Sequence, residues 1–181
     1  MNNGQTPERF SRKQREQWST FGYVLSLLPA ALDSQMRQTT GIAYFDFRVL
    51  SALSQAPDGT LRMNELASYI GSSLSRLSNG VRRLEERKWV RRNADPSDGR
   101  FTLATLTSSG FAKVEAATPS QTAEVMRLVF NTLSDAQLRQ LVSISRCILE
   151  ALDAPCPDWG ILYNQWPQNH PENGGASLGK A

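Results

Sequence analysis

Basic side chains are concentrated in one part of this 181-residue chain. The window 76–100 holds eight Lys or Arg and four acidic residues, a net charge of +4, although the whole chain carries only +3. Sixteen of the twenty basic residues in the chain are arginines, and a guanidinium suits phosphate oxygens and guanine edges. Because the cluster spans two expected elements, a polyanion partner is as well supported as the alternative, a solvated helix face.

One helical segment in this window has two chemically different faces. Apolar residues spaced by three and four positions predict a stripe that faces a core: Leu74, Leu77, Val81 and Leu84. The opposite face and its flanks carry hydroxyls, one amide and guanidiniums: Ser72, Ser75, Arg76, Ser78, Asn79, Arg82 and Arg83. We expect the three arginines to contact grooves and phosphates, and Ser75, Ser78 and Asn79 to read base edges.

A polar β-hairpin is predicted directly after this helix. Residues 89–93 and 101–106 show the alternation and the β-favouring side chains of strands. The stretch 94–100 between them is rich in turn formers and ends in Arg100. The hairpin therefore carries a guanidinium at its tip.

The N-terminal part of the chain is predicted to form two helices. Apolar residues at steps of three and four predict the first over 11–38, with a kink at Pro29 because proline removes one backbone hydrogen bond. Asp46 is expected to cap the second helix, which stops before the turn signature at 57–59.

A short connecting unit leads from these helices to the polar-faced one. Residues 60–62 predict no more than a stub of strand, and a short helix follows that Asn64 caps and Gly71 ends. Gly80, inside the polar-faced helix, has two open interpretations: packing slack, or room for a close approach.

Two further helices are predicted after the hairpin. Thr107 or Ser108 caps the first, which Pro119 interrupts as a kink, and Ser134 or Asp135 caps the second. The second helix is expected to turn six apolar residues inward: Leu138, Leu141, Val142, Ile148, Leu149 and Leu152.

Helix, short helix, polar-faced helix and hairpin, in this order, predict a winged helix-turn-helix. Several stretches carry a more specific signal: Leu66-Ala67, Ser75-Arg76-Leu77, Val81-Arg82-Arg83-Leu84-Glu85, Val90-Arg91-Arg92, Asp95-Pro96-Ser97-Asp98-Gly99-Arg100 and Leu106-Thr107-Ser108-Ser109-Gly110. With these stretches the chain resembles the MarR family of bacterial transcriptional regulators over residues 18–152.

This resemblance implies an α+β, mostly helical fold. A winged helix-turn-helix DNA-binding core at 44–106 is flanked by long dimerisation helices at 11–40 and 107–153, and a tail covers 154–181. The family likeness further implies an obligate homodimer that binds double-stranded DNA at a pseudo-palindromic operator and usually represses nearby genes, in response to a ligand.

The resemblance also assigns roles at the hairpin. Asp98 and Arg100 fall on the acidic-basic pair of the family's wing, whose arginine enters the minor groove while the aspartate steadies a basic side chain. Lys88 and Trp89 depart from the family, which often has Gly and Leu there, and Gly80 is also uncommon in a recognition helix. We therefore expect the turn into the wing to be built differently.

The terminal helices carry more apolar surface than a small winged-helix core can cover. We expect these stripes to bury against a partner chain: the segment 18–32 together with Leu138, Leu141, Ile148 and Leu152. The resemblance also suggests a small-molecule effector pocket near the junction of the first two helices, lined by Phe21, Tyr23, Leu28, Tyr44 and Phe47. Ordinary core is the favoured interpretation for most of these five residues.

Other function classes are disfavoured by the sequence. It contains no phosphate loop, dinucleotide fingerprint or zinc-ligand spacing, its one histidine, His170, lies in the tail, and Ser177-Leu178-Gly179-Lys180 is a chance match to a catalytic pattern. We expect no enzyme activity and no cofactor. A winged helix for protein or RNA contacts needs exposed apolar residues on its recognition face, whereas this face is Ser, Asn and Arg. An activator, or a regulator without a ligand, remains an alternative.

The composition predicts a soluble, cytoplasmic protein. Its longest nearly apolar run, 23–32, has ten residues, half of the roughly 20 that span a bilayer, and no signal peptide is evident. Cys147 and Cys156 do not make a disulfide framework, and redox sensing is disfavoured for both.

Overall fold

A computed structural model describes residues 9–153, so the predicted tail at 154–181 lies outside the described part. The elements follow in the order α1 (Arg12–Thr40), α2 (Tyr44–Gln55), a 3-10 turn (Pro57–Gly59), β1 (Thr60–Arg62), α3 (Met63–Tyr69), α4 (Leu74–Glu86), β2 (Val90–Ala94), β3 (Thr102–Leu106), α5 (Ser108–Val125), a π-helical turn (Met126–Phe130) and α6 (Asp135–Ala151).

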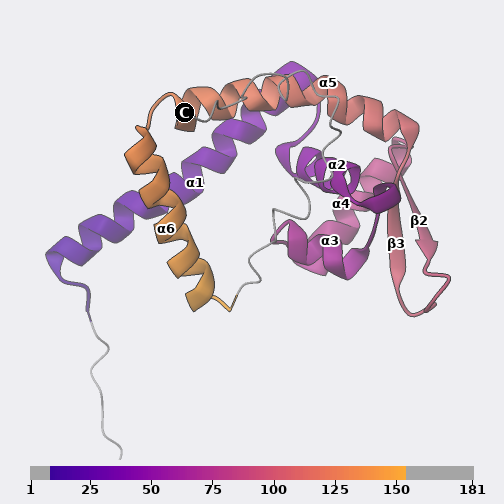
Figure 1. Cartoon of the computed structure of the whole chain (residues 1–181), viewed down its shortest axis with the longest axis horizontal. Coiled ribbons are helices and arrows are strands. Elements are labelled where there is room, and N and C mark those ends of the chain that lie inside the picture. Colours follow the sequence, from indigo (N-terminus) through magenta and orange to yellow (C-terminus); the bar gives the residue numbers. More distant parts are fainter. Residues whose placement is uncertain (1–8, 154–181) are drawn as a thin grey trace, which may run out of the picture.

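The three strands form one small antiparallel sheet in the order β1-β3-β2. Thr60 of β1 lies opposite Thr105, and Val90 of β2 lies opposite Leu106, so β3 is the central strand. Helices α2, α3 and α4 gather beside this sheet, while α5 runs from the hairpin across the molecule (Figure 1). The fold is α+β, mostly helical, and contains the predicted winged helix-turn-helix.

The core joins α4 to the rest of the winged helix. Side chains with 0–1% of their surface exposed come from α2, α3, α4 and β2: Val49, Leu50, Leu53, Leu66, Leu77, Val81, Leu84 and Val90. Three of them are on α4 at steps of four and three, as the sequence predicts. Burial of this stripe fixes which face of α4 points outward.

Leu74, the fourth predicted member of the stripe, lies outside this core. Its side chain is 52% exposed, because α4 begins at this residue and its first turn projects beyond the packed layer. The inward assignment of Leu74 was therefore wrong.

Two predicted helix caps were also wrong. Helix α2 begins at Tyr44, so Asp46 lies in its first turn, where it is 5% exposed and bonded to another helix. Helix α3 begins at Met63, and the carboxylate of Glu65 accepts the backbone N–H of Arg62 at 3.2 Å, which places Asn64 inside the helix. In both cases the residue expected as the cap is a polar residue inside the first turn of the helix.

The helix bounds also bear on the other predicted caps and on the two prolines inside helices. Thr107 caps α5 by accepting the N–H of Gly110 at 3.1 Å, and Ser134 caps α6. Helix α5 continues through Pro119, and α1 continues through Pro29, so neither proline ends its helix.

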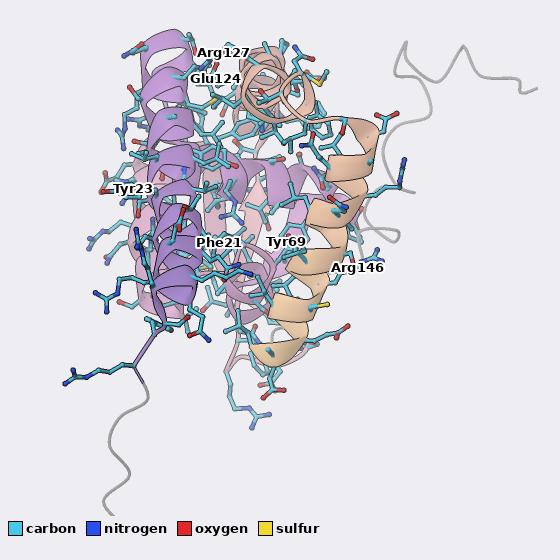
Figure 2. All side chains as sticks on the ribbon, turned by 90° about the vertical axis from the view of Figure 1, so that its left-hand side faces the viewer. Phe21, Tyr23, Tyr69, Glu124, Arg127 and Arg146 are labelled. Atoms are coloured by element: carbon cyan, nitrogen blue, oxygen red, sulfur yellow. The ribbon has the colours of Figure 1, made fainter. Side chains whose placement is uncertain are left out.

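Helix α6 does not pack its apolar side chains inside this chain. None of its residues is buried, and Leu141, Val142 and Ile148 are 43%, 52% and 39% exposed. Figure 2 shows α6 standing apart from α1, on the opposite side of the view. The inward prediction for these residues was wrong for the single chain, because nothing in residues 9–153 covers that face.

Candidate nucleic-acid interface

Helix α4 presents a polar surface opposite its buried stripe. Ser73 caps the helix by accepting the N–H of Arg76 at 3.2 Å. Five of the seven side chains predicted for this surface are exposed: Ser75, Arg76, Asn79, Arg82 and Arg83. Ser78 is half-buried on α4, and Ser72 is half-buried and precedes the helix. The structure thus brings the predicted set together along one helix and its entrance.

The three arginines of α4 are held in three different ways. Arg82 donates Nη2 to the amide oxygen of Asn79 at 3.1 Å, which keeps both groups on the exposed face. Arg76 lies over the ring of Phe45, 4.7 Å from its centroid. Arg83 donates Nη2 to Oδ1 of Asp46 at 2.7 Å, an ion pair between α4 and α2. Arg83 is therefore anchored, in contrast with the free phosphate contact that the sequence predicts.

The role of Gly80 is decided by its neighbour on α2. A Cβ atom at this position would lie 2.7 Å from Cε1 of Phe45, closer than side chains approach in proteins. Gly80 therefore gives room for a close approach, and the same phenyl ring supports Arg76.

The hairpin places an arginine at its exposed end. Arg100 donates Nε to Oδ1 of Asp98 at 2.9 Å and Nη2 to Oδ2 at 2.6 Å, a two-pronged ion pair. The Arg100 side chain is 85% exposed. Hydrogen bonds from the Arg100 guanidinium, the larger effect, and from the Arg100 backbone N–H lower the pKa of Asp98 below its ordinary value. The aspartate thus stays ionised and orients the arginine.

A second ion pair joins the hairpin to β1, and sequence reasoning missed it. Arg62 donates Nε to Oδ2 of Asp95 at 2.7 Å, and its guanidinium lies 4.7 Å from the ring centroid of Phe101. The hydroxyl and backbone N–H of Ser97 also bond Asp95. No short-range pattern links Arg62 to the turn, because only the β1–β3 pairing brings them together.

The turn into the hairpin is made by Lys88. Its φ of +61° lies in the left-handed region, where glycine is the residue with least strain. The hydroxyls of Thr107 and Ser109 donate to the Lys88 carbonyl at 2.7 and 2.9 Å. At Gly110 a Cβ atom would lie 2.2 Å from the Trp89 carbonyl oxygen, so only glycine fits there. This contact explains the glycine of the Leu-Thr-x-x-Gly stretch.

A cleft of about 1020 Å³ lies between α1, α2 and α4. Leu28 and Tyr44, two of the five residues predicted for an effector pocket, line it together with Arg76 and Arg83 of α4. The other three do not reach it: Phe47 is a core residue, and Figure 2 shows Phe21 and Tyr23 leaving α1 on different sides. Tyr23 is 68% exposed, so it is not a core residue either.

Other candidate chemistry is sparse in the described residues. Cys147 is an exposed free thiol, while Cys156, His170 and residues 177–180 lie outside the described part. No group of three or more His, Cys, Asp or Glu side chains in residues 9–153 could hold a metal ion. None of the helices in this range is long and apolar enough to cross a membrane.

Comparisons with known proteins agree on one family. Residues 40–100 match the model of the MarR family. Sco3205, a MarR family transcriptional regulator from Streptomyces coelicolor solved in complex with DNA, is 34% identical and superposes with a TM-score of 0.78 over 81% of this chain and 92% of its own. AbsC from the same organism is 29% identical, with a TM-score of 0.75 over 81% of this chain and 98% of its own. The transcriptional repressor MprA of Escherichia coli (strain K12) is 27% identical over 129 residues, 71% of this chain and 73% of the repressor.

Proposed function

Because this chain belongs to the MarR family of transcriptional regulators, we propose that it represses transcription as a homodimer bound to a pseudo-palindromic operator. The observation that carries the proposal is the exposed Ser, Asn and Arg face of α4, held outward by the buried stripe on its other side. The relative Sco3205 was solved with DNA, and MprA is a repressor, which supports DNA as the partner and repression as the outcome.

In this proposal α4 enters the major groove as the recognition helix. Ser75, Ser78 and Asn79 read base edges, since hydroxyl and amide groups match the donors and acceptors displayed there. Arg76 and Arg82 contact phosphates or guanine edges, and both side chains are exposed. The hydrogen bond between Arg82 and Asn79 pre-orients two of these groups before DNA arrives.

The hairpin β2–β3 acts as the wing. Arg100 is the most exposed of the ion-paired arginines and lies beside the turn, so it can enter the minor groove, whose negative potential attracts guanidinium groups. Asp98 orients it through both carboxylate oxygens.

The homodimer accounts for apolar side chains that the single chain leaves in water. Trp18 and Leu25 of α1 are 57% and 54% exposed, and Leu152 after α6 is 67% exposed. A second copy that packs against these helices removes this surface from water. It also sets two copies of α4 about one DNA helical turn apart, as a palindromic site requires.

A small-molecule effector is proposed for the cleft between α1, α2 and α4. Arg76 and Arg83 line this cleft and belong to the recognition helix. A molecule bound there changes how α4 is presented to DNA, and this links binding to release of the operator.

The test is in vitro selection of duplex DNA by the purified full chain, followed by sequencing and light scattering of the complex. We expect an enriched palindrome bound by two chains. Arg82→Ala should weaken binding to this duplex and relax base preference at one position in each half-site. Selection without any enriched sequence, or unchanged affinity of Arg82→Ala, would contradict the assignment of α4.

A further inference from the structure

One arginine of the recognition helix has its charge balanced inside the fold. The carboxylate of Asp46, on α2 and 5% exposed, accepts Arg83 Nη2 at 2.7 Å. The Arg83 side chain itself is 50% exposed and donates Nη1 to the backbone oxygen of Asn79 at 3.2 Å. In the part of the chain that the structure describes, neither Arg76 nor Arg82 forms such a pair with a carboxylate.

The pair lies beside a close contact between α2 and α4. Gly80, one turn before Arg83, leaves space for the ring of Phe45, which neighbours Asp46 in sequence. Both partners are therefore held by packed helices, and the guanidinium takes a fixed direction while half of the side-chain surface stays exposed. A buried carboxylate without its cation is strongly unfavourable, so Asp46 keeps Arg83 in place.

Specific and non-specific DNA binding depend on different properties of such a group. Non-specific binding is driven by net positive charge, through release of counterions from the phosphates. Recognition of a sequence depends on short-range hydrogen bonds from donors in fixed positions. A neutral, rigid arginine–aspartate pair supplies hydrogen-bond donors in fixed positions for sequence recognition. It adds no net positive charge for non-specific binding.

We propose that Asp46 is a specificity-determining positioning residue, which fixes Arg83 for operator contacts and cancels its attraction to random DNA. This inference rests on the proposed function of α4 as the recognition helix. It adds a residue on α2 that does not itself touch DNA.

The test compares the affinity for the selected operator duplex with that for a random-sequence duplex of equal length. Fluorescence anisotropy at several KCl concentrations measures both affinities and the slope of log K against log salt. Asp46→Asn keeps the side-chain size and removes the charge. We expect its slope on random DNA to steepen by about 0.9 for each arginine set free, and the operator-to-random ratio to fall about tenfold.

Two variants separate this effect from a change in total charge. Glu124→Gln also adds one positive charge, and it frees Arg127, which Glu124 binds at 2.6 Å near the end of α5 that is remote from α4 (Figures 1 and 2). We expect its slope on random DNA to match that of the unmodified protein. The double variant with Asp46→Asn and Arg83→Gln restores the net charge, so its slope should return to normal while its affinity for the operator stays low.

Circular dichroism melting shows whether each variant is folded. If Asp46→Asn does not fold, Asp46→Glu serves instead, since it keeps the charge and moves the carboxylate by one methylene. Its expected result is an unchanged slope with a reduced operator-to-random ratio, and an unchanged ratio overturns the inference.

The inference is also overturned if folded Asp46→Asn and Glu124→Gln have the same salt slope on random DNA and the same operator-to-random ratio. Failure of the proposed function gives a different result, because Arg82→Ala then leaves operator affinity unchanged. If Arg82→Ala binds the operator more weakly while Asp46→Asn changes neither the slope nor the operator-to-random ratio, only the role of Asp46 is contradicted.

Discussion

Arg62 of β1 and Asp95 of the wing turn are joined by a hydrogen-bonded ion pair, with Nε 2.7 Å from Oδ2. The pair ties the edge strand of the sheet to the base of the turn that carries Asp98 and Arg100. Because the same guanidinium also lies over the Phe101 ring, one side chain braces both ends of the turn. The direction of the wing thus depends on a residue that lies outside the hairpin.

The first prediction concerns acid. Hydrogen bonds from the Ser97 hydroxyl and backbone, followed by the Arg62 ion pair, lower the pKa of Asp95 from its ordinary 3.8 to about 2. A carboxyl whose pKa falls on folding stabilises the fold at pH above its ordinary pKa, and this contribution is lost as the pH drops from about 4 towards 2. We expect the chemical shifts of the wing amides to stay constant through pH 4 and to change only as the pH approaches 2, because the carboxylate of Asp95 then becomes protonated.

NMR titration measures the pKa of the Asp95 carboxyl and the pH at which the chemical shifts of the wing amides change. In Arg62→Gln with Ser97→Ala, we expect the pKa of Asp95 to move back towards 3.8. A midpoint near 3.8 in the unmodified protein would show that the turn is not held by this carboxylate.

The second prediction tests the wing arginine. Arg100→Ala should keep a folded dimer, because the side chain is 85% exposed, and should bind the operator much more weakly through loss of the minor-groove contact. Gel shift measures the affinity for the operator, and light scattering measures whether the variant is a dimer. Arg127→Ala is the matched control, since it removes an exposed, carboxylate-paired arginine from another part of the chain. Equal operator affinity of the two variants would remove the wing from the proposal.

Patterns within single elements predicted much of this fold. The spacing of Leu77, Val81 and Leu84 gave the buried face of α4, and alternation with turn formers gave both strands of the wing. Each pattern has its cause within one element, in a helical or strand period, and is therefore visible in the sequence.

Features that join distant elements were not predictable in this way. Asp46 looks like a cap until α4 brings Arg83 to it, and Arg62 meets Asp95 only through the pairing of β1 with β3. Leu74 fits the apolar period but lies past the edge of the core. Sequence periodicity carries no information on where a packed layer ends, so these three positions required the structure.

The third prediction concerns the backbone of the turn before the wing. Lys88 has a φ of +61°, and a non-glycine residue in the left-handed region costs about 1–2 kcal/mol. Lys88→Gly relieves this strain but gives the unfolded chain more freedom, which offsets about 0.5–1 kcal/mol. We expect a net stabilisation of about 0.5–1 kcal/mol, measured as a higher Tm.

Lys88→Ala is the control for loss of the lysine side chain, since it keeps the strained backbone. Its Tm should stay at or below that of the unmodified protein. A rise in Tm as large as that of Lys88→Gly would assign the gain to the side chain and contradict the strain argument.

The last prediction concerns α6 and the dimer. The segment 134–153 contains α6 (Asp135–Ala151) with its N-cap Ser134, and two apolar side chains of α6, Leu141 and Ile144, are 43% and 56% exposed in the single chain. If the partner chain covers them, their removal uncovers the matching surface around Trp18 on α1, which is itself 57% exposed. We expect deletion of 134–153 to yield an unstable or aggregated protein rather than a DNA-binding monomer, because large exposed apolar patches drive association. Light scattering and gel shift on the deletion variant measure this, and a soluble monomer with full operator affinity would contradict the dimer.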